Sequence, residues 1–344
     1  GSSRLDSLDE ESLHATVQET DIEMARVGHH SENAVVNRHY SHAPIDDADI
    51  IGSTTNAAAV LDMDSFDLVV VDEATQASQP ATMVPWLKGT PLILAGDHRQ
   101  LPPYCSNETA KEEDMHISLF EHLFNLYGSD VSERLDLQYR MNKEIANFVS
   151  DAFYDRPLQH GPDNADWTIG GLESIIGLDV DSHEETTSQT ASKYNSAEAE
   201  VVARSVNHLQ GYDIETKDIG IITPYTAQIR EITKALDKRN IHGRSNIKVD
   251  TIDSFQGSER EAIIVSFVRS NDYNSSGFLT FPHEGKLRLN VALTRAKRRL
   301  VLIGNWDTLS TVADHKSPEE SCAYVYADLR DYLEAMGRLR SVTL

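Results

Sequence analysis

An apolar run that ends in two carboxylates is the first group of residues that could do chemistry. Phe66–Val71 is apolar apart from Asp67, and it leads directly into Asp72 and Glu73. At the end of a strand, the first carboxylate of such a pair can hold Mg²⁺, and the second can deprotonate an attacking water. The simpler alternative is a buried strand that ends in an acidic turn.

A second apolar run, Leu92–Ala95, ends in a different polar group. Gly96 follows it and permits a tight turn, and Gln100 comes four residues later. A neutral amide can hydrogen-bond both a γ-phosphate and a water, so Gln100 would suit a sensor of hydrolysis. The alternative is again an ordinary turn after a buried strand.

Two arginines stand in motif-like settings further along the chain. Arg140 lies in Leu135–Asn142 and Arg295 in Leu289–Arg298, with the polar turn Ile252–Glu259 between them. An arginine delivered to a γ-phosphate neutralises charge in the transition state, and its forked guanidinium does this better than lysine. Taken alone, each arginine could equally be a surface salt-bridge residue.

These residues need a sheet to position them. Short β-rich apolar runs alternate with helical stretches, which predicts an α/β fold with doubly wound parallel sheets. The expected strands are Asp49–Ser53, Phe66–Val71, Pro91–Ala95, Ile219–Thr223, Lys248–Thr251, Ala262–Phe267 and Leu300–Ile303. Several are apolar throughout, as expected for strands covered on both faces.

The helices follow from apolar residues at i, i+3 and i+4 spacing. The expected helices are Ile117–Tyr127, Asn142–Phe153, Ala197–Leu209, Ala227–Lys238 and Tyr324–Met336. The polar stretch Asp179–Ser192 is expected to be a solvent-exposed loop, and Asp272–Gly285 a second loop. We place a domain boundary near Ser129–Arg134, which divides the chain into residues 1–133 and 134–344.

The motifs, in this order, resemble motifs II to VI of superfamily 1 helicases of the 1B group. The forms Asp-Glu-Ala-Thr-Gln, Gly-Asp-His-Arg-Gln-Leu-Pro-Pro, Gln-Tyr-Arg-Met and Val-Ala-Leu-Thr-Arg-Ala-Lys are typical of one subgroup. That subgroup includes the nonsense-mediated-decay helicase, senataxin and the immunoglobulin-switch-region helicase. The resemblance runs from Ile22 to Thr308. It implies two RecA-like domains: an incomplete first one in residues 1–133 with motifs Ic, II and III, and a second in residues 134–344 with motifs IV, V and VI.

The resemblance also implies an ATP site. Asp72 would handle Mg²⁺, Glu73 would be the catalytic base and Gln100 would sense the γ-phosphate. Arg140 and Arg295 would be the arginine fingers. The residues expected near the nucleotide are Tyr139, which would stack on adenine, Gly257 and Glu259.

Single-stranded DNA or RNA is the implied partner, with movement in the 5′→3′ direction. The residues expected to contact the nucleic acid are Thr54, Thr55, Thr223, Pro224, Tyr225 and Thr251. Hydroxyls and backbone amides bind phosphate without reading sequence, and aromatic rings add base stacking. The alternative for Thr54 and Thr55 is the N-cap of a helix that begins at Ala57, and both roles can coexist.

The phosphate-binding motif GxxxxGK[ST] is absent from these residues. Its lysine and backbone amides cradle the phosphates, and in the family it precedes motif Ic. We therefore expect this chain to be a fragment of a helicase and to be inactive by itself. A split gene and a degenerate, non-catalytic relative are the alternatives.

The net charge of −24 is unusual for a protein that binds a polyanion. Residues 1–133 hold 6 Lys and Arg against 24 Asp and Glu, while residues 134–344 hold 25 against 31. Such self-repulsion destabilises a compact fold in dilute salt. We expect a halophilic protein, and an acidic face for a basic partner is the alternative.

The two cysteines, Cys105 and Cys322, are typical of a reduced, cytoplasmic protein. No apolar run reaches the roughly 18–20 residues of a membrane span, so we expect no membrane association. A non-catalytic RecA-like module that binds nucleic acid or protein remains the alternative function. A metal site at His29, His30, His39 and His42 is a weaker hypothesis, because these histidines lack strict ligand spacing.

Overall fold

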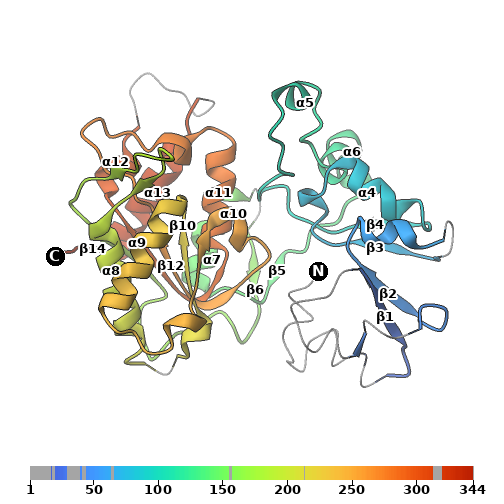
Figure 1. The fold of residues 1–344 in the computed structure, drawn as a ribbon, viewed down its shortest axis with the longest axis horizontal. Coiled ribbons are helices and arrows are strands. Elements are labelled where there is room, and N and C mark those ends of the chain that lie inside the picture. The colour runs from blue at the N-terminus through green and yellow to red at the C-terminus, as the bar shows by residue number, and fades with distance from the viewer. Residues whose placement is uncertain are drawn as a thin grey trace. The chain divides into compact units, whose positions relative to one another are not determined.

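The computed structural model describes residues 17, 20–28, 39–40, 44–62, 66–154, 157–212, 214–312 and 320–343. Contacts divide the chain into two compact units, residues 1–133 (unit 1) and residues 134–344 (unit 2). Figure 1 shows the elements of both units. Among the described residues, no helix is long and apolar enough to cross a membrane.

The described part of unit 1 contains two pairs of parallel strands. β1 (Met24–Val27) pairs with β2 (Ile50–Ser53), and β3 (Val69–Val71) pairs with β4 (Leu92–Leu94). Its helices are α4 (Gln79–Trp86), α5 (Glu108–Glu112), α6 (Leu119–Tyr127) and the short 3₁₀ segments η1 (Ala57–Val60), η2 (Ala74–Gln76) and η3 (Gly128–Asp130).

The core of unit 1 covers one face of the β3–β4 pair. Val69 and Val71 are buried with Ala74, and Phe120 of α6 packs against them. Val70 and Ile93 point to the other face and are 58% and 50% exposed. Successive side chains of a strand face opposite sides, so the expectation of strands covered on both faces is wrong for this pair within the described part of unit 1.

Unit 2 is built on one six-stranded parallel sheet with the order β11-β10-β12-β13-β7-β14. The strands are β7 (Ile175–Asp179), β10 (Ile219–Thr223), β11 (Lys248–Thr251), β12 (Arg260–Ser266), β13 (Ala296–Gly304) and β14 (Leu339–Ser341). Two small pairs accompany the sheet: parallel β5 (Leu137–Gln138) with β6 (Gln159–His160), and antiparallel β8 (Glu185–Thr186) with β9 (Lys193–Tyr194).

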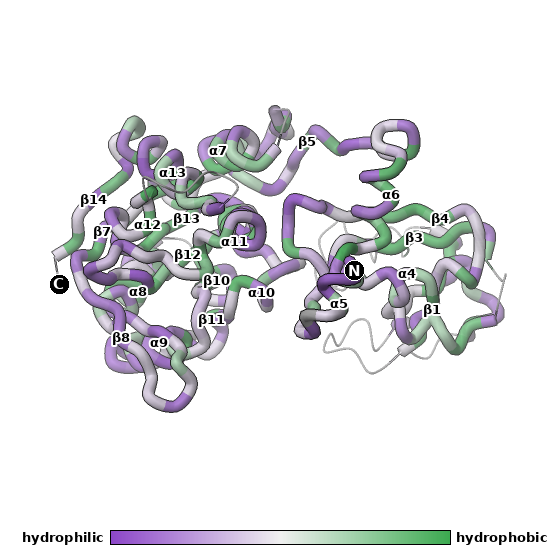
Figure 2. Tube along the Cα trace, turned by 90° about the horizontal axis from the view of Figure 1, so that it is seen from above, coloured by the Kyte–Doolittle hydropathy of each residue, from purple (hydrophilic) through white to green (hydrophobic). Residues whose placement is uncertain are grey.

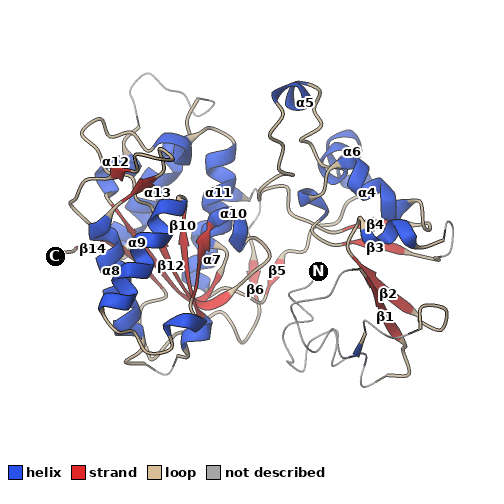
Figure 3. Cartoon of the chain, viewed as in Figure 1, coloured by secondary structure: helices blue, strands red, loops and turns tan. Residues whose placement is uncertain are grey.

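Helices cover both faces of this sheet (Figure 3). The helices are α7 (Lys143–Phe153), α8 (Ser196–Leu209), α9 (Thr226–Lys238), α10 (Ile252–Phe255), α11 (Glu284–Leu293), α12 (Trp306–Ser310) and α13 (Ala323–Ala335), with the 3₁₀ segments η4 (Thr216–Asp218), η5 (Arg244–Asn246) and η6 (Gly277–Thr280). On one face α8 and α9 pack through residues such as Val202 and Ile232. On the other, Gly177 of β7 leaves room for Leu333 of α13 and Trp306 of α12.

The expectation of an α/β fold with parallel sheets is confirmed. Hydrophobic stretches coincide with strands such as β3, β4 and β13 (Figure 2). The predicted strand Ile219–Thr223 matches β10, and Lys248–Thr251 matches β11. The strands β7 and β14 were missed; β14 is short, polar and half-exposed, so no apolar run marked it.

The expectation of a solvent-exposed loop at Asp179–Ser192 is partly wrong. Its first residue ends β7, and Glu185–Thr186 forms β8 against β9. The Glu184 side chain is only 8% exposed because it pairs with Lys193 and Arg269. A buried ion pair lets a very polar segment pack against the unit.

Candidate functional site

The carboxyl ends of β3 and β4 bring two of the predicted motifs together in unit 1. The backbone N–H of Ala95 donates to the Val71 carbonyl at 2.9 Å, and that of Ala74 donates to the Ala95 carbonyl at 2.8 Å. Asp72 and Glu73 leave β3 at this edge, and the segment that holds Gln100 leaves β4. Ligands of open α/β sheets bind at this edge.

The two turns touch each other at Gly96. A Cβ atom on Gly96 would lie 3.0 Å from Thr75 Cγ2 and 3.1 Å from the Thr75 backbone nitrogen. This is tighter than ordinary van der Waals contact, so a larger residue would push the turn after β3 away from the turn after β4. The tight-turn role assigned to Gly96 is therefore accompanied by a packing role.

Glu73 and Gln100 are both held by hydrogen bonds. Glu73 has a left-handed φ of 52°, and its Oε2 accepts from Gln76 Nε2 at 2.7 Å. Gln100 Nε2 donates to Asp97 Oδ2 at 2.9 Å. A non-glycine residue in this region of φ and ψ is uncommon and is found at functional sites. Asp97, which sequence reasoning gave no role, therefore orients the predicted sensor.

A hollow of about 410 Å³ lies beside Glu73 in unit 1. Thr55, Gln76, Pro103 and Tyr104 also line it. Thr55, which was predicted to contact nucleic acid, therefore lines the same hollow as Glu73, the predicted catalytic base. Tyr104 is 93% exposed and directly follows the Pro-Pro pair, but its position gave no signal in the sequence.

Thr54 is hydrogen-bonded to the first residue of η1. Its Oγ1 accepts a hydrogen bond from the Ala57 backbone N–H at 3.2 Å. The N-cap residue of η1 is nevertheless Asn56, which makes no side-chain cap hydrogen bond, so Thr54 does not occupy the cap position that the alternative gave it. A strand contact would have to use the remaining hydrogen-bonding capacity of this hydroxyl.

Unit 2 brings together one residue from each of motifs IV, V and VI. Arg140 Nε donates to Glu259 Oε2 at 2.5 Å, and Lys297 Nζ lies 3.0 Å from Glu259 Oε1. Burial alone would raise the pKa of Glu259, but the charges of Arg140 and Lys297 outweigh it and lower that pKa. Glu259 is thus the ionised centre of a three-residue cluster.

Tyr139 presents much of its ring to solvent. It is 64% exposed. A Cβ atom on Gly161 would lie 2.5 Å from Tyr139 Cδ1, so the ring packs directly on the backbone of that glycine. Gln138 shapes the turn, because its Oε1 accepts from the backbone N–H groups of Arg140 and Met141. Sequence reasoning had assigned a role neither to Gly161 nor to Gln138.

Arg295 is turned into the interior of unit 2. It is 2% exposed. Its Nε donates to the Val291 carbonyl at 3.1 Å, Nη1 to the Ser258 carbonyl at 3.4 Å and Nη2 to Thr294 Oγ1 at 2.9 Å. A phosphate contact from Arg295 would require this side chain to change its partners, whereas Arg140 is 41% exposed.

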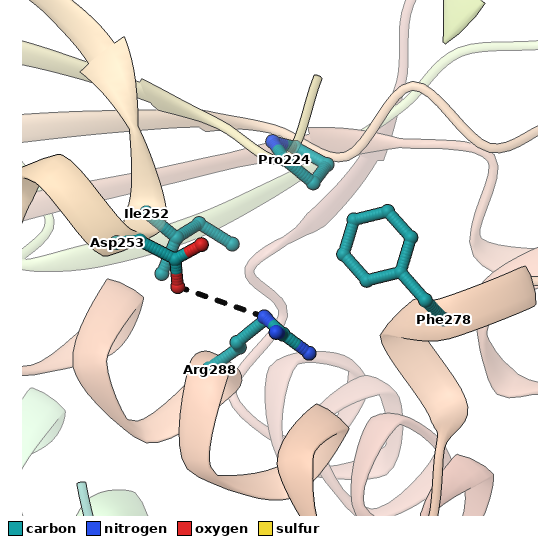
Figure 4. Close-up of a pocket in the computed structure, with 5 residues that line it drawn as sticks. All are labelled: Pro224, Ile252, Asp253, Phe278 and Arg288. Carbon is teal, nitrogen blue, oxygen red and sulfur yellow. Dashed lines mark ion pairs between the residues drawn. The ribbon is translucent and has the colours of Figure 1, made fainter. Parts of the chain in front are cut away.

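A pocket of about 260 Å³ lies where β10 and β11 end. Pro224, Ile252, Asp253, Phe278 and Arg288 line it (Figure 4). The Arg288 guanidinium carbon lies 5.3 Å from the centre of the Phe278 ring, and Arg288 Nε lies 3.6 Å from Asp253 Oδ1. An arginine on an aromatic ring next to an acceptor can hold a flat, polar group such as a nucleobase.

The residues of unit 2 that were predicted to bind nucleic acid lie around this pocket, and their side chains differ in exposure. Pro224 lines it, and the Thr251 hydroxyl caps α10 by accepting from the Ser254 N–H at 3.4 Å. Thr223 is fully buried, so its side chain is closed to a ligand in this conformation. Asp253, Phe278 and Arg288 were missed; Phe278 comes from a segment that was expected to be a plain loop.

Gly257 follows α10 with a left-handed φ of 75°. The conformation favours glycine, and no atom within 4 Å would meet a Cβ there. The next residue is Ser258, whose carbonyl accepts a hydrogen bond from Arg295, and Glu259 follows it. Gly257 therefore permits the turn that delivers Glu259 to Arg140.

The histidine hypothesis falls mostly outside the described residues and stays untested. His29, His30 and His42 lie outside the described residues, and His39 is described. No group of three or more His, Cys, Asp or Glu that could hold a metal ion occurs within the described ranges.

The carboxyl of Glu198 in unit 2 is fully buried. Glu198, in the first turn of α8, accepts from Ser266 Oγ at 2.7 Å and from the Val268 N–H at 2.9 Å. Burial raises the pKa of Glu198 to about 8, although these two hydrogen bonds act against the rise. Glu198 is therefore mostly protonated at neutral pH in the folded chain.

This burial predicts a pH-dependent stability. Between the ordinary pKa of 4.5 and the folded value of about 8, the folded state keeps a proton that the unfolded state releases. The free energy of unfolding should thus fall as pH rises through this window, by at most about 1.4 kcal/mol per pH unit. Glu198→Gln should remove that part of the slope. Denaturant unfolding of both proteins across the window tests this, and parallel stability curves would contradict it.

The family described as AAA domain matches residues 115–307, which are more than half of the chain. The chain belongs to the AAA domain family. A second match of the same description covers residues 3–108.

Curated relatives of this AAA-domain chain are named helicases. An uncharacterised ATP-dependent helicase of Methanocaldococcus jannaschii is 38% identical over 76% of this chain and 40% of its own length. The DNA polymerase alpha-associated DNA helicase A of Schizosaccharomyces pombe is 36% identical over 72% and 38%. The ATP-dependent helicase NAM7 of Saccharomyces cerevisiae is 35% identical over 75% and 27%. The resemblance to superfamily 1 helicases is confirmed, and the chain spans two fifths or less of these relatives.

Proposed function

We propose that the protein, in its full length, is an ATP-dependent helicase or translocase that moves 5′→3′ on single-stranded DNA or RNA. The observation that carries the proposal is the shared edge of β3 and β4, where Asp72, Glu73 and Gln100 follow neighbouring parallel strands. The helicase names of the relatives support the same activity.

Each residue at this edge has a role that fits its chemistry. The Asp72 carboxylate supplies the oxygen ligands that Mg²⁺ prefers, and the ion would neutralise charge on the ATP phosphates when bound. Glu73, held by Gln76, would take the proton of the attacking water. Gln100, held by Asp97, would sense the γ-phosphate.

Unit 2 carries the other residues that the resemblance assigns to ATP. Arg140 and Arg295 would neutralise transition-state charge, and Tyr139 would stack on adenine from its support on Gly161. Each unit would be a RecA-like domain, the first of them incomplete. The residues proposed to hold the nucleic acid are Thr54, Thr55, Pro224, Tyr225 and Thr251, joined by Asp253, Phe278 and Arg288 of the pocket. Thr223, whose side chain is buried in this conformation, would have to become exposed to join them.

The direct test is ATP hydrolysis by the protein in its full length, with Mg²⁺, with and without single-stranded DNA or RNA. We expect turnover that a single strand stimulates. A protein that binds strands in a salt-dependent manner but hydrolyses no ATP would instead be a non-catalytic binding module. Stimulation by only one of the two nucleic acids would assign the substrate.

We also propose that the protein is adapted to high salt, because its net charge is −24 and most of that charge lies in residues 1–133. The screening length falls from about 10 Å at 0.1 M salt to about 3 Å at 1 M. The melting temperature should therefore rise strongly between these KCl concentrations. An uncharged osmolyte at matched osmolality is the control, since it stabilises without screening. Equal melting temperatures at the two KCl concentrations would contradict the proposal.

A reducing compartment, the cytoplasm, is the location that we propose. Cys105 and Cys322 are both without a disulfide. Cys322 is buried, and burial raises its pKa to about 11, which keeps it an unreactive thiol.

A further inference from the structure

The turn after β12 has an unusual backbone. Val268 has a φ of 73°, in the left-handed region that β-branched residues rarely adopt. Both of its backbone groups are held: its N–H donates to Glu198 Oε2 at 2.9 Å, and its carbonyl accepts from Asn195 Nδ2 at 3.4 Å. Such a strained residue persists only where the surroundings hold it, and it is frequent beside functional sites.

This turn points the next side chain, Arg269, toward Glu184. Arg269 Nε donates to Glu184 Oε2 at 2.8 Å, and the side chains of the two residues are 9% and 8% exposed. The backbone N–H of Ser270 donates to the same oxygen at 2.9 Å, and Lys193 Nζ lies 2.7 Å from Glu184 Oε1. Glu184 belongs to the polar segment Asp179–Ser192, to which no function has been assigned.

Glu184 is ionised in this arrangement. Burial alone would raise the pKa of Glu184, but hydrogen bonds from Lys193 and Ser270 and the charge of Arg269 together lower it. A fully partnered, buried carboxylate between two cations is costly to disrupt on one side only. Glu184 therefore restrains the position of Arg269.

Arg269 in turn contacts Tyr225, an aromatic residue beside the unit 2 pocket. Its Nη1 donates to the Tyr225 hydroxyl at 3.3 Å, and the Tyr225 ring meets the Phe278 ring edge-on with 5.1 Å between their centres. A Cβ atom on Gly277 would lie 2.0 Å from Arg269 Nη1, so the guanidinium packs on the backbone next to Phe278. A displaced Arg269 would release the Tyr225 hydroxyl and remove the support of the backbone next to Phe278.

We propose that Glu184 is a positioning residue for strand binding: through Arg269 it sets the orientation of Tyr225 and Phe278 at the pocket. The proposal rests on the proposed function, in which these rings lie at the nucleic acid. The proposal gives a residue of the polar segment Asp179–Ser192 a role in binding nucleic acid. Its negative charge by itself would weaken such binding, because a carboxylate repels a nearby polyanion.

The sign of the effect makes the test sharp. Glu184→Ala and Glu185→Ala each remove one negative charge from neighbouring residues, but the Glu185 side chain is exposed and contacts Tyr194. If only charge mattered, both variants would bind a polyanion slightly more tightly. We expect Glu184→Ala to bind single-stranded DNA or RNA about tenfold more weakly, which is within the effect of losing one aromatic stacking contact. Glu185→Ala should bind as wild type or tighter.

Binding is measured by fluorescence anisotropy with a labelled oligonucleotide, and the KM for ATP should be unchanged in Glu184→Ala. If that variant melts below the assay temperature, Glu184→Gln and Glu185→Gln replace the pair. Glu184→Gln keeps one acceptor oxygen for Arg269, so its loss should be smaller than that of the alanine variant.

A double-mutant comparison decides whether the effect passes through Tyr225. In a Tyr225→Ala background, Glu184→Ala should weaken binding little further. Full additivity of the two losses, or undiminished binding by Glu184→Ala alone, would overturn the inference while the proposed function stands. If neither wild type nor any variant binds single strands, the proposed function fails and the inference fails with it.

Discussion

Replacing Glu73 by Gln is expected to lower ATP turnover of the full-length protein by about 10²–10⁴-fold, the usual contribution of a general base. The amide has nearly the same shape, and its oxygen can still accept from Gln76 Nε2, which now lies 2.7 Å from Glu73 Oε2. The turn after β3 should therefore keep its conformation. What is lost is a group that can take a proton from water.

Steady-state phosphate release, with single-stranded nucleic acid bound to the same extent in both proteins, measures this effect. Glu112→Gln on α5 is the matched control, because it makes the same chemical change at an exposed position of unit 1. Turnover by Glu73→Gln close to wild type would remove Glu73 from the role of base. The hydrolytic group would then have to be sought elsewhere at the edge of β3 and β4.

Replacing Arg140 by Ala has the second large expected effect, a fall in turnover of about 10³–10⁵-fold, as for the loss of an arginine finger. Unit 2 should stay folded, because Lys297 remains 3.0 Å from Glu259 after Arg140 is truncated. Binding of a single strand should be unchanged. Single-turnover hydrolysis with saturating ATP separates the loss of chemistry from a loss of nucleotide affinity.

Arg298→Ala is the control for this prediction. Arg298 has the same side-chain exposure as Arg140, 41%, and pairs with Glu261 at 2.7 Å. Its removal costs the same charge on the same unit. Equal turnover by the Arg140 and Arg298 variants would mean that Arg140 serves only to hold Glu259.

Arg140 is a cleaner test than the second predicted finger. Arg295 is buried, and it donates to the Val291 carbonyl of α11, to the Ser258 carbonyl and to the hydroxyl of the neighbouring Thr294. Truncation of a buried, hydrogen-bonded arginine destabilises the fold as well as any site it serves. A loss of turnover in Arg295→Ala would thus have two causes, and its melting temperature must be measured beside it.

The sequence alone determined which β-strands are followed by residues that could act in catalysis. Parallel strands in an α/β sheet present their carboxyl ends at a common edge, so a polar residue after an apolar run can be placed without coordinates. Asp72, Glu73 and Gln100 were placed in this way, and the structure has them after β3 and β4. The order of the motifs was sufficient to recognise the family, since it depends on residue identity alone.

Only the tertiary structure decided which side chains meet. Arg140 and Glu259 are 119 positions apart, and Glu184 and Arg269 are 85 apart. Periodicity reports which face of its own element a residue occupies, but no partner on another element. The same limit applies to Arg295, whose burial follows from carbonyls at Val291 and Ser258 that no sequence pattern marks. Long-range packing therefore decided which arginine is accessible and why a buried acid lies beside the proposed strand-binding pocket.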